Sequence, residues 1–217
     1  MKNRIFLAAL CLLLLCFAGC DEWRGIRGNG HIITQQRPVS AFTRIKAGGF
    51  YRLQWQPGAP SCSLTTDENL LSHIKTTMEG DVLRIELEDS VAPTHGIKVA
   101  LTSPSLTGAD LGGAAEMEAT QLSGGTFALQ TGGATKVTLA GKVNRLLADL
   151  TGASKLQASD LAANDVELSV TGAGKATVNA TDLLKAAITG AGEVRYSGNP
   201  KSVEKHITGA GKIAPVD

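Results

Sequence analysis

The sequence predicts an all-β protein whose C-terminal half is a right-handed parallel β-helix with rungs of about 18–20 residues. The prediction rests on a recurring Thr-Gly corner, on apolar residues that alternate before each corner, and on the lack of a helical pattern between the corners. The chain has 25 Gly, and its aromatic content is only 4%, so small aliphatic side chains must pack the core. This composition favours thin stacked layers.

The Thr-Gly corner recurs at regular spacing through the second half of the chain. Successive copies are 20, 20, 18 and 19 residues apart, and a weaker copy, Leu111-Gly112-Gly113, lies another 20 residues upstream. The copies begin at Thr131, Thr151, Thr171, Thr189 and Thr208. Regular spacing of this kind indicates a structural repeat. Gly at the corner suits a turn with positive φ, and the small residue after it suits close approach of neighbouring rungs.

Apolar residues occupy every second position before each corner. The triplets, apolar except for Lys205, are Leu146/Ala148/Leu150, Val166/Leu168/Val170, Leu184/Ala186/Ile188 and Val203/Lys205/Ile207. A period of two predicts a half-buried strand, and shorter apolar pairs after each corner predict a second strand in every rung. Stacked rungs would place Leu150, Val170, Ile188 and Ile207 in one core column. The alternative architecture is an antiparallel sandwich of hairpins.

The same alternation predicts which polar side chains of the rungs point outward. They are Thr135, Lys136, Thr138, Lys155, Gln157, Lys175, Thr177, Asn179 and Arg195. A regular polar face of this kind can bind a glycan or another protein, or can simply be solvated.

The preceding segment, from His31 to about residue 110, predicts an N-terminal β-rich part that caps the β-helix. Alternating strands are expected at 42–46, 51–55, 83–87 and 97–101, separated by Gly and Pro turn signals. The segment from Asp67 to Ile74 differs, because it carries apolar residues at helical spacing after a potential Asp cap. We expect one or two helical turns there.

Residues 1–19 have the pattern of a signal peptide. Lys2 and Arg4 precede an apolar stretch that is too short to span a bilayer comfortably, and Ala18-Gly19-Cys20 follows it. This ending resembles the bacterial lipobox, which implies cleavage before Cys20 and lipidation of Cys20. Asp21 resembles the signal that retains enterobacterial lipoproteins in the inner membrane. Residues 20–30 would then form the lipidated Cys and a tether.

Charge and cysteine content narrow the function classes. The net charge is +1, and removal of Lys2 and Arg4 with the leader leaves 19 basic against 20 acidic residues, which argues against nucleic acid as a partner. Cys62 would be the single remaining thiol, so no disulfide framework is expected, and its simplest role is that of a small buried strand residue. The four His residues lack metal-ligand spacing, and no cofactor is expected.

A carbohydrate-active enzyme on a β-helix scaffold is the alternative function. Its candidate carboxylates are Asp149, Asp160, Asp165 and Asp182, which we place in or near turns of successive rungs. Asp is common in turns because its side chain hydrogen-bonds the nearby backbone. Neither His nor Arg recurs beside these positions as a partner for acid–base catalysis. The sequence therefore predicts no catalytic residue, unless these carboxylates meet in one groove.

The whole mature chain resembles the bacterial head GIN domain family, whose members are named as auto-transporter adhesins. The resemblance rests on Gly28-Asn29-Gly30, the segment 37–45, the segment 67–74, the segment 80–85, and the TGAG corners at Thr171, Thr189 and Thr208. It implies export, often as a lipoprotein, and a β-solenoid at 111–217 after an N-terminal part at 31–110. We therefore expect a non-catalytic lipid-anchored protein on the periplasmic side of the cell envelope, with an envelope glycan or protein as its partner.

Overall fold

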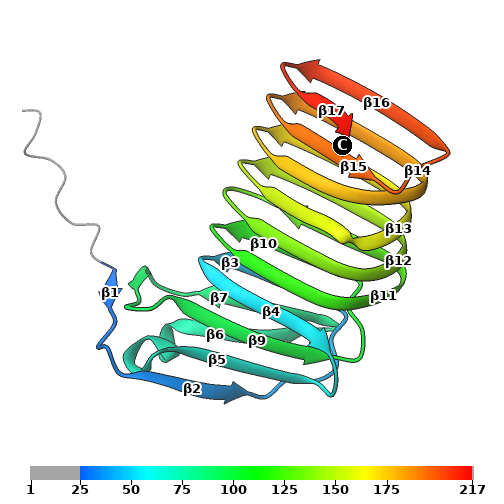
Figure 1. Ribbon diagram of the computed structural model, residues 1–217. Helices are drawn as coiled ribbons and strands as arrows, with labels where there is room; N and C mark the ends of the chain where they lie inside the picture. The colour runs from blue at the N-terminus through cyan, green and yellow to red at the C-terminus, as the bar shows by residue number, and fades with distance from the viewer. Residues whose placement is uncertain (1–24, 217) are drawn as a thin grey trace, which may run out of the picture.

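The computed structural model describes residues 25–216, which form a single stack of strands (Figure 1). Each rung contributes one strand to each of two opposite faces, joined at a glycine corner. Face A contains the strands that lead into the corner: β3 (Arg44–Gly49), β7 (Val82–Leu87), β10 (Gly108–Gly113), the second halves of β11 (Glu116–Thr131), β12 (Lys136–Gly152), β13 (Lys155–Gly172) and β14 (Lys175–Gly190), and β16 (Ser202–Gly209). Face B contains the strands that follow it: β4 (Tyr51–Pro57), β9 (Ile97–Ser103), the first halves of β11 to β14, β15 (Glu193–Ser197) and β17 (Lys212–Pro215).

Parallel pairing of successive rungs confirms the predicted solenoid, which makes about 5 turns between residues 108 and 215. Leu150 pairs with Val170, Val170 with Ile188, and Ile188 with Ile207. The first three side chains are at most 1% exposed, so the predicted core column exists. The pairs between β10 and β17 are all parallel, and this excludes the antiparallel sandwich.

The N-terminal part continues the same stack, but out of chain order. Strand β3 lies between β7 and β10, and β4 lies between β9 and β11, so the β7/β9 rung lies below the β3/β4 rung. Three antiparallel strands then close the lower end: β2 (Ile32–Arg37), β5 (Ser61–Asp67) and β6 (Ile74–Glu79). The strands expected at 42–46, 51–55, 83–87 and 97–101 are confirmed as β3, β4, β7 and β9.

A column of glycines with positive φ forms the corner that joins the faces. Its members in successive rungs are Gly49, Gly113, Gly133, Gly152, Gly172, Gly190 and Gly209. A Cβ added at Gly172 would lie 2.7 Å from the carbonyl oxygen of Gly152, and every member of the column after Gly49 has the same conflict with the glycine of the rung below. Both the backbone conformation and the contact therefore require glycine.

The strand register differs by one residue from the predicted alignment of the repeats at the Thr131 corner. Thr131 pairs with Leu150 and not with Thr151, so Gly133, the second glycine of its corner, stacks on Gly152. Thr131 is consequently an inward residue, only 6% exposed. A Thr-Gly-Gly corner contains two possible positions for the turn glycine, and spacing alone selected the wrong one.

Thr135 was also assigned wrongly to the outward polar set. It is 2% exposed, and its hydroxyl hydrogen-bonds that of Ser154 at 3.0 Å inside the stack. Ser154 in turn donates to the carbonyl of Thr151 at 3.0 Å. A polar side chain is ordinarily expected to point outward, but two buried hydroxyls that hydrogen-bond each other can occupy inward positions.

The C-terminal end of the stack is open. Val203 and Ile207 occupy inward positions of β16 but are 36% and 42% exposed, because no rung formed by residues 25–216 covers them. Lys205, the exception in the predicted triplets, lies between them with its ammonium 5.1 Å from the centre of the Tyr196 ring. It also donates to the carbonyl of Ile213 at 3.3 Å. An inward charge is tolerated here because this position faces solvent, and such a charge disfavours strand addition at an edge.

At the opposite end, Asp67 fastens the start of the described chain to the stack. The helical segment is confirmed as a 3₁₀ helix, η2 (Glu68–His73), but the Asp67 side chain does not cap it. The carboxylate is fully buried and accepts hydrogen bonds from Gly30 N at 2.8 Å and from Thr94 N and Oγ1 at 2.9 and 2.8 Å. Nearby, β1 (Ile26–Arg27) pairs with β8 (Val91–Ala92). The end of the expected tether, residues 25–30, is thus held against the folded body.

The hydrogen bonds that Asp67 accepts from Gly30 and Thr94, here called the Asp67 clamp, make local stability depend on pH. Burial raises the pKa of Asp67, but the hydrogen bonds from Thr94 and Gly30 outweigh it and hold the pKa below its ordinary value. The pKa of Asp67 in the folded protein is lower than its value of about 3.9 in the unfolded chain. The ionised carboxylate therefore stabilises the fold at pH values above about 3.9, and this contribution is lost as pH falls through the folded pKa.

We therefore expect the amides of Gly30 and Thr94 to lose hydrogen-exchange protection below about pH 4, and Asp67→Asn to lose that protection already at neutral pH. Asp160→Asn, at an exposed position, is the matched control and should leave the exchange unchanged. Equal protection of both amides in Asp67→Asn and in the unmodified protein would show that the clamp is unimportant.

Candidate functional site

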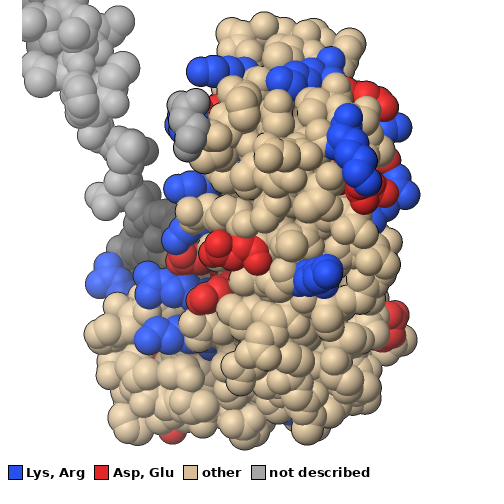
Figure 2. Space-filling model, turned by 45° about the vertical axis from the view of Figure 1, so that its right-hand side comes forward, with Lys and Arg blue, Asp and Glu red and all other residues tan. Residues whose placement is uncertain are grey.

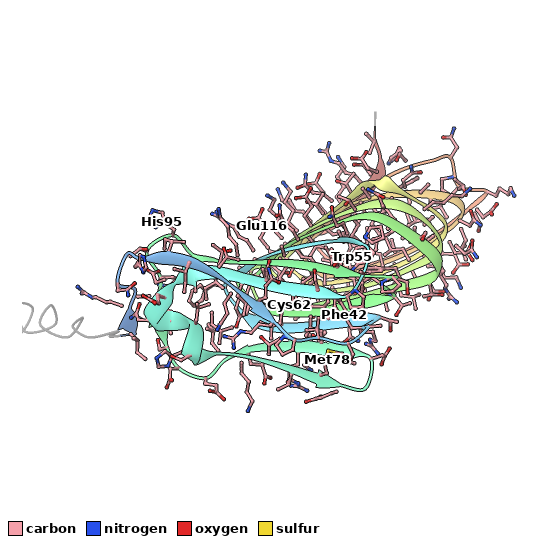
Figure 3. All side chains as sticks on the ribbon, turned by 90° about the horizontal axis from the view of Figure 1, so that it is seen from below. Phe42, Trp55, Cys62, Met78, His95 and Glu116 are labelled. Atoms are coloured by element: carbon pink, nitrogen blue, oxygen red, sulfur yellow. The ribbon has the colours of Figure 1, made fainter. Side chains whose placement is uncertain are left out.

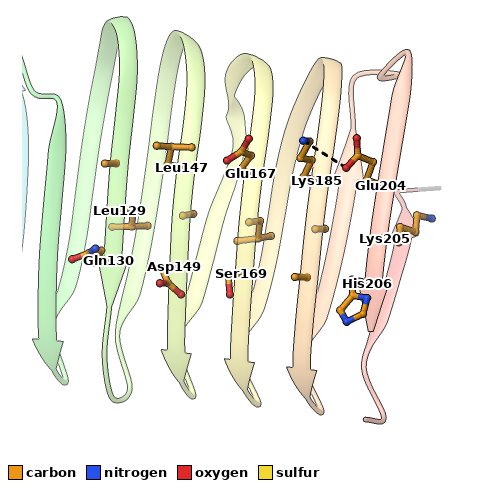
Figure 4. A pocket seen from close by; sticks show the side chains of 15 residues that line it. Leu129, Gln130, Leu147, Asp149, Glu167, Ser169, Lys185, Glu204, Lys205 and His206 are labelled. Atoms are coloured by element: carbon orange, nitrogen blue, oxygen red, sulfur yellow. Dashed lines mark ion pairs between the residues drawn. The ribbon is translucent and has the colours of Figure 1, made fainter. Parts of the chain in front are cut away.

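A groove of about 760 Å³ crosses the outer side of face A (Figure 4). Its walls come from the second halves of β11 to β14 and from β16, so it runs along the stack and not along any one strand. This volume is within the roughly 300–1,000 Å³ range of ligand sites. The groove is larger than two other surface hollows, which have volumes of about 410 and 230 Å³.

Strand register sorts the outward side chains of the groove into two rows. One row is Ala128, Leu147, Glu167, Lys185 and Glu204, and the other is Gln130, Asp149, Ser169, Ala187 and His206. Neighbours within a row are about 4.8 Å apart, the spacing of hydrogen-bonded strands. The small side chains of Ala128, Ser169 and Ala187 leave room beside the longer ones. The groove therefore depends on exact register between rungs.

Charged groups of both signs lie along the groove. Lys185 and Glu204 form an ion pair at 3.6 Å, shown by the dashed line in Figure 4. Arg145, at the margin, pairs with Glu167. On the face seen in Figure 2, acidic and basic side chains likewise occur in small groups separated by uncharged surface. The site thus presents paired charges around an aliphatic residue, Leu147, and has no strong field of one sign.

The four candidate carboxylates of the enzyme alternative do not meet. Asp149 is in the groove, whereas Asp165 pairs in register with Arg145, and Asp182 forms an ion pair with Lys201 at 2.5 Å. Asp160 lies opposite Ala140 at a register shift of β12 and β13. Scattered carboxylates cannot act as an acid and base pair on one bond.

Cys62 is a buried core residue, as the sequence suggested. Its side chain is 0% exposed and lies within the N-terminal part (Figure 3), in the same hydrophobic core as Phe42. Burial raises the pKa of the Cys62 thiol to about 11, although Arg37 lowers it slightly. The thiol is therefore protonated at neutral pH and is a poor nucleophile.

The structure also bears on metal binding and on membrane-spanning helices within the described residues. Across residues 25–216, no group of His, Cys, Asp and Glu side chains has the arrangement of a metal site. Helices in the same range are too short or too polar to cross a membrane. Cys20 and Asp21 lie outside the described residues.

The polar residues that the sequence predicted to point outward lie on a different face from the groove. Lys136, Lys155, Gln157, Lys175 and Thr177 do point outward, but they belong to face B. The groove is on face A, where the outward residues alternate with the inward members of each triplet. Alternation could have identified these residues one by one, but only the register between rungs shows that they line one hollow.

Taken together, these features define a β-solenoid with a surface groove on face A, in which the four candidate carboxylates are not brought together. Residues 41–200 match the family model described as "Putative auto-transporter adhesin, head GIN domain". The chain therefore belongs to the head GIN domain family, as its motifs indicated. This is a family of adhesins by name, and no catalytic family is indicated.

Solved structures share the fold. A crystal structure described as "a putative adhesin" from Bacteroides fragilis is 23% identical, has a TM-score of 0.68, and is covered completely by a match to 88% of this chain. A "putative adhesin" from Parabacteroides merdae is 22% identical with a TM-score of 0.54, over 88% of this chain and 99% of that one. A "putative lipid binding protein" from Parabacteroides distasonis is 23% identical with a TM-score of 0.53, over the same shares. No curated protein matches the chain.

Proposed function

We propose that this protein is a non-catalytic, lipid-anchored protein of the bacterial cell envelope that binds a partner protein through the face A groove. The observation that carries the proposal is the groove itself, which places Leu147 among the charged side chains Asp149, Glu167, Lys185 and Glu204. Apolar centres with polar margins are typical of protein interfaces. Membership of an adhesin family agrees with a binding role.

The paired charges favour recognition over catalysis. Glu167 forms an ion pair with Arg145, and Glu204 forms one with Lys185. Acid–base catalysis requires an acid and a base whose surroundings give them different pKa values, and the groove does not assemble such a pair from these residues. Charges of this kind select a partner with complementary charges and set its orientation. The rival proposal of a polysaccharide-acting enzyme would need carboxylates that converge, and the four candidates are dispersed.

The anchor is proposed at Cys20, after removal of residues 1–19. Several acyl chains, at about 0.8 kcal/mol per buried CH₂, would hold the protein on the membrane. Residues 25–30 are held against the closed lower end by β1 and Asp67, and the groove lies farther along the stack, toward its C-terminal end. A partner approaching from beyond the membrane could reach it.

We expect Cys20→Ser to move the protein from the membrane fraction to the soluble fraction, or to leave it unprocessed, because lipidation needs the thiol. Fractionation followed by mass measurement of the N-terminus reads out both results. Cys62→Ser is the control and should stay in the membrane fraction. Unchanged membrane association and mass in Cys20→Ser would refute the anchor. Asp21 leads us to propose the inner membrane, and recovery wholly in the outer membrane would reject that proposal.

Groove occupancy is tested with residues 25–217 as a soluble domain added to envelopes from cells that lack the protein. We expect saturable binding that Ala187→Trp abolishes, because the indole fills the space beside Ser169. Thr177→Trp, on face B, should bind as the unmodified domain does. Equal binding by both variants would place the contact elsewhere on the molecule.

A further inference from the structure

A second hollow, of about 410 Å³, lies on the outer side of face B where the stack meets the antiparallel closing strands. Two rows of outward side chains form it. The first row is Glu118, Gln54, Ala100, Ser63 and Gln36, and the second is Gln56, Thr102 and Ser61. These residues come from β11, β4, β9, β5 and β2, so the trough exists only because the N-terminal part folds onto the solenoid.

Side-chain size explains the hollow. In the first row the middle positions are Ala100 and Ser63, whereas Gln54 and Gln36 lie on either side of them. In the second row Ser61 hydrogen-bonds Thr102 at 2.7 Å, which keeps both hydroxyls at the floor. Long amides therefore form walls around a short floor.

The chemistry of the lining is neutral and rich in hydrogen-bonding groups. Amides and hydroxyls supply most of the polar atoms, and Glu118 is the one charged residue among those that line the trough. Gln54 donates to the Glu118 carboxylate at 3.5 Å. No Lys, Arg or His lines it, so a phosphate or carboxylate ligand would find no cation. The inward Trp55 is 3% exposed and donates to Ser103 at 3.0 Å, so its ring is not available for stacking.

We propose that this trough binds a neutral glycan. Sugar hydroxyls both donate and accept, and they match amides, which present a donor and an acceptor side by side. Without an exposed ring for stacking, affinity rests on these hydrogen bonds alone. The trough lies on the opposite face from the groove, so the proposal goes beyond the proposed function and stands independently of it.

The test titrates residues 25–217 with neutral hexasaccharides of glucose, mannose and N-acetylglucosamine, and with anionic polygalacturonate, while backbone amide NMR signals are followed. We expect at least one neutral series to bind with a Kd below about 10 mM and to shift signals of β4, β5 and β9. Gln54→Ala combined with Gln56→Ala should weaken binding about tenfold, and Ala100→Trp should abolish it. Gln157→Ala, on the same face but outside the trough, should bind unchanged.

Three results would overturn the proposal: no binding by any neutral series up to about 10 mM, preference for polygalacturonate, or binding that survives Ala100→Trp in a folded protein. Far-ultraviolet circular dichroism of each variant verifies the fold. The groove variant Ala187→Trp should keep glycan binding, and Ala100→Trp should keep envelope binding. Failure of one proposal is therefore distinguishable from failure of the other.

Discussion

Val170→Asp is expected to unfold much of the solenoid. Val170 is 1% exposed and stacks between Leu150 and Ile188, each 0% exposed, so the new carboxylate would have no polar partner above or below it. Burying an unpaired charge costs several kcal/mol against a total stability of about 5–15 kcal/mol. Thermal unfolding followed by circular dichroism should show a greatly lowered Tm or no cooperative transition.

Thr177→Asp is the matched control for this prediction. Thr177 belongs to the same repeat and points outward between the buried neighbours Ala176 and Val178, and its register partners are Gln157 and Arg195. Its carboxylate would be solvated, so Tm should change by only a few degrees. A stable Val170→Asp protein beside an unfolded Thr177→Asp protein would mean that inward and outward positions had been exchanged.

Gly172→Ala is expected to produce the second large effect. Gly172 has φ +114°, and the added Cβ would lie 2.7 Å from the carbonyl oxygen of Gly152 in the rung below. The backbone conformation alone costs about 1–3 kcal/mol in a non-glycine residue, and the contact adds to it. Denaturant unfolding should show the loss of stability as a lower midpoint.

Gly132→Ala provides the comparison, because Gly132 is also in a corner but without positive φ and with nothing within 4 Å of an added Cβ. It should match or slightly exceed the stability of the unmodified protein, since Ala reduces the entropy of the unfolded chain. Equal losses in the two variants would remove the special role of the glycine column.

Local patterns were sufficient to predict the solenoid, because each inward position repeats the same chemistry. Leu150, Val170 and Ile188 could be placed in one column from alternation and spacing alone. Thr131 shows the limit, since two adjacent glycines made the corner ambiguous by one residue. The outward placement of Thr135 was wrong for another reason. Its hydroxyl hydrogen-bonds Ser154 inside the core, and sequence spacing does not show such a partner.

Long-range pairing lay beyond sequence reasoning. The β7/β9 rung lies below the β3/β4 rung although it follows in the chain, and no local signal specifies that order. Both proposed binding sites depend on this kind of information. The groove needs Leu147, Glu167 and Lys185 in register, and the trough needs β5 placed against β9. None of the polar residues that the sequence predicted to point outward lines either hollow.

The most direct measurement of the binding claim is photo-cross-linking in living cells that make the full-length protein. A photoreactive amino acid at Ser169, inside the groove, should give a discrete protein adduct that identifies the partner, and Ala187→Trp in the same chain should abolish it. The same amino acid at Thr177, on face B, should give no such adduct. An adduct at Thr177 with none at Ser169 would contradict the assignment of the groove as the binding site.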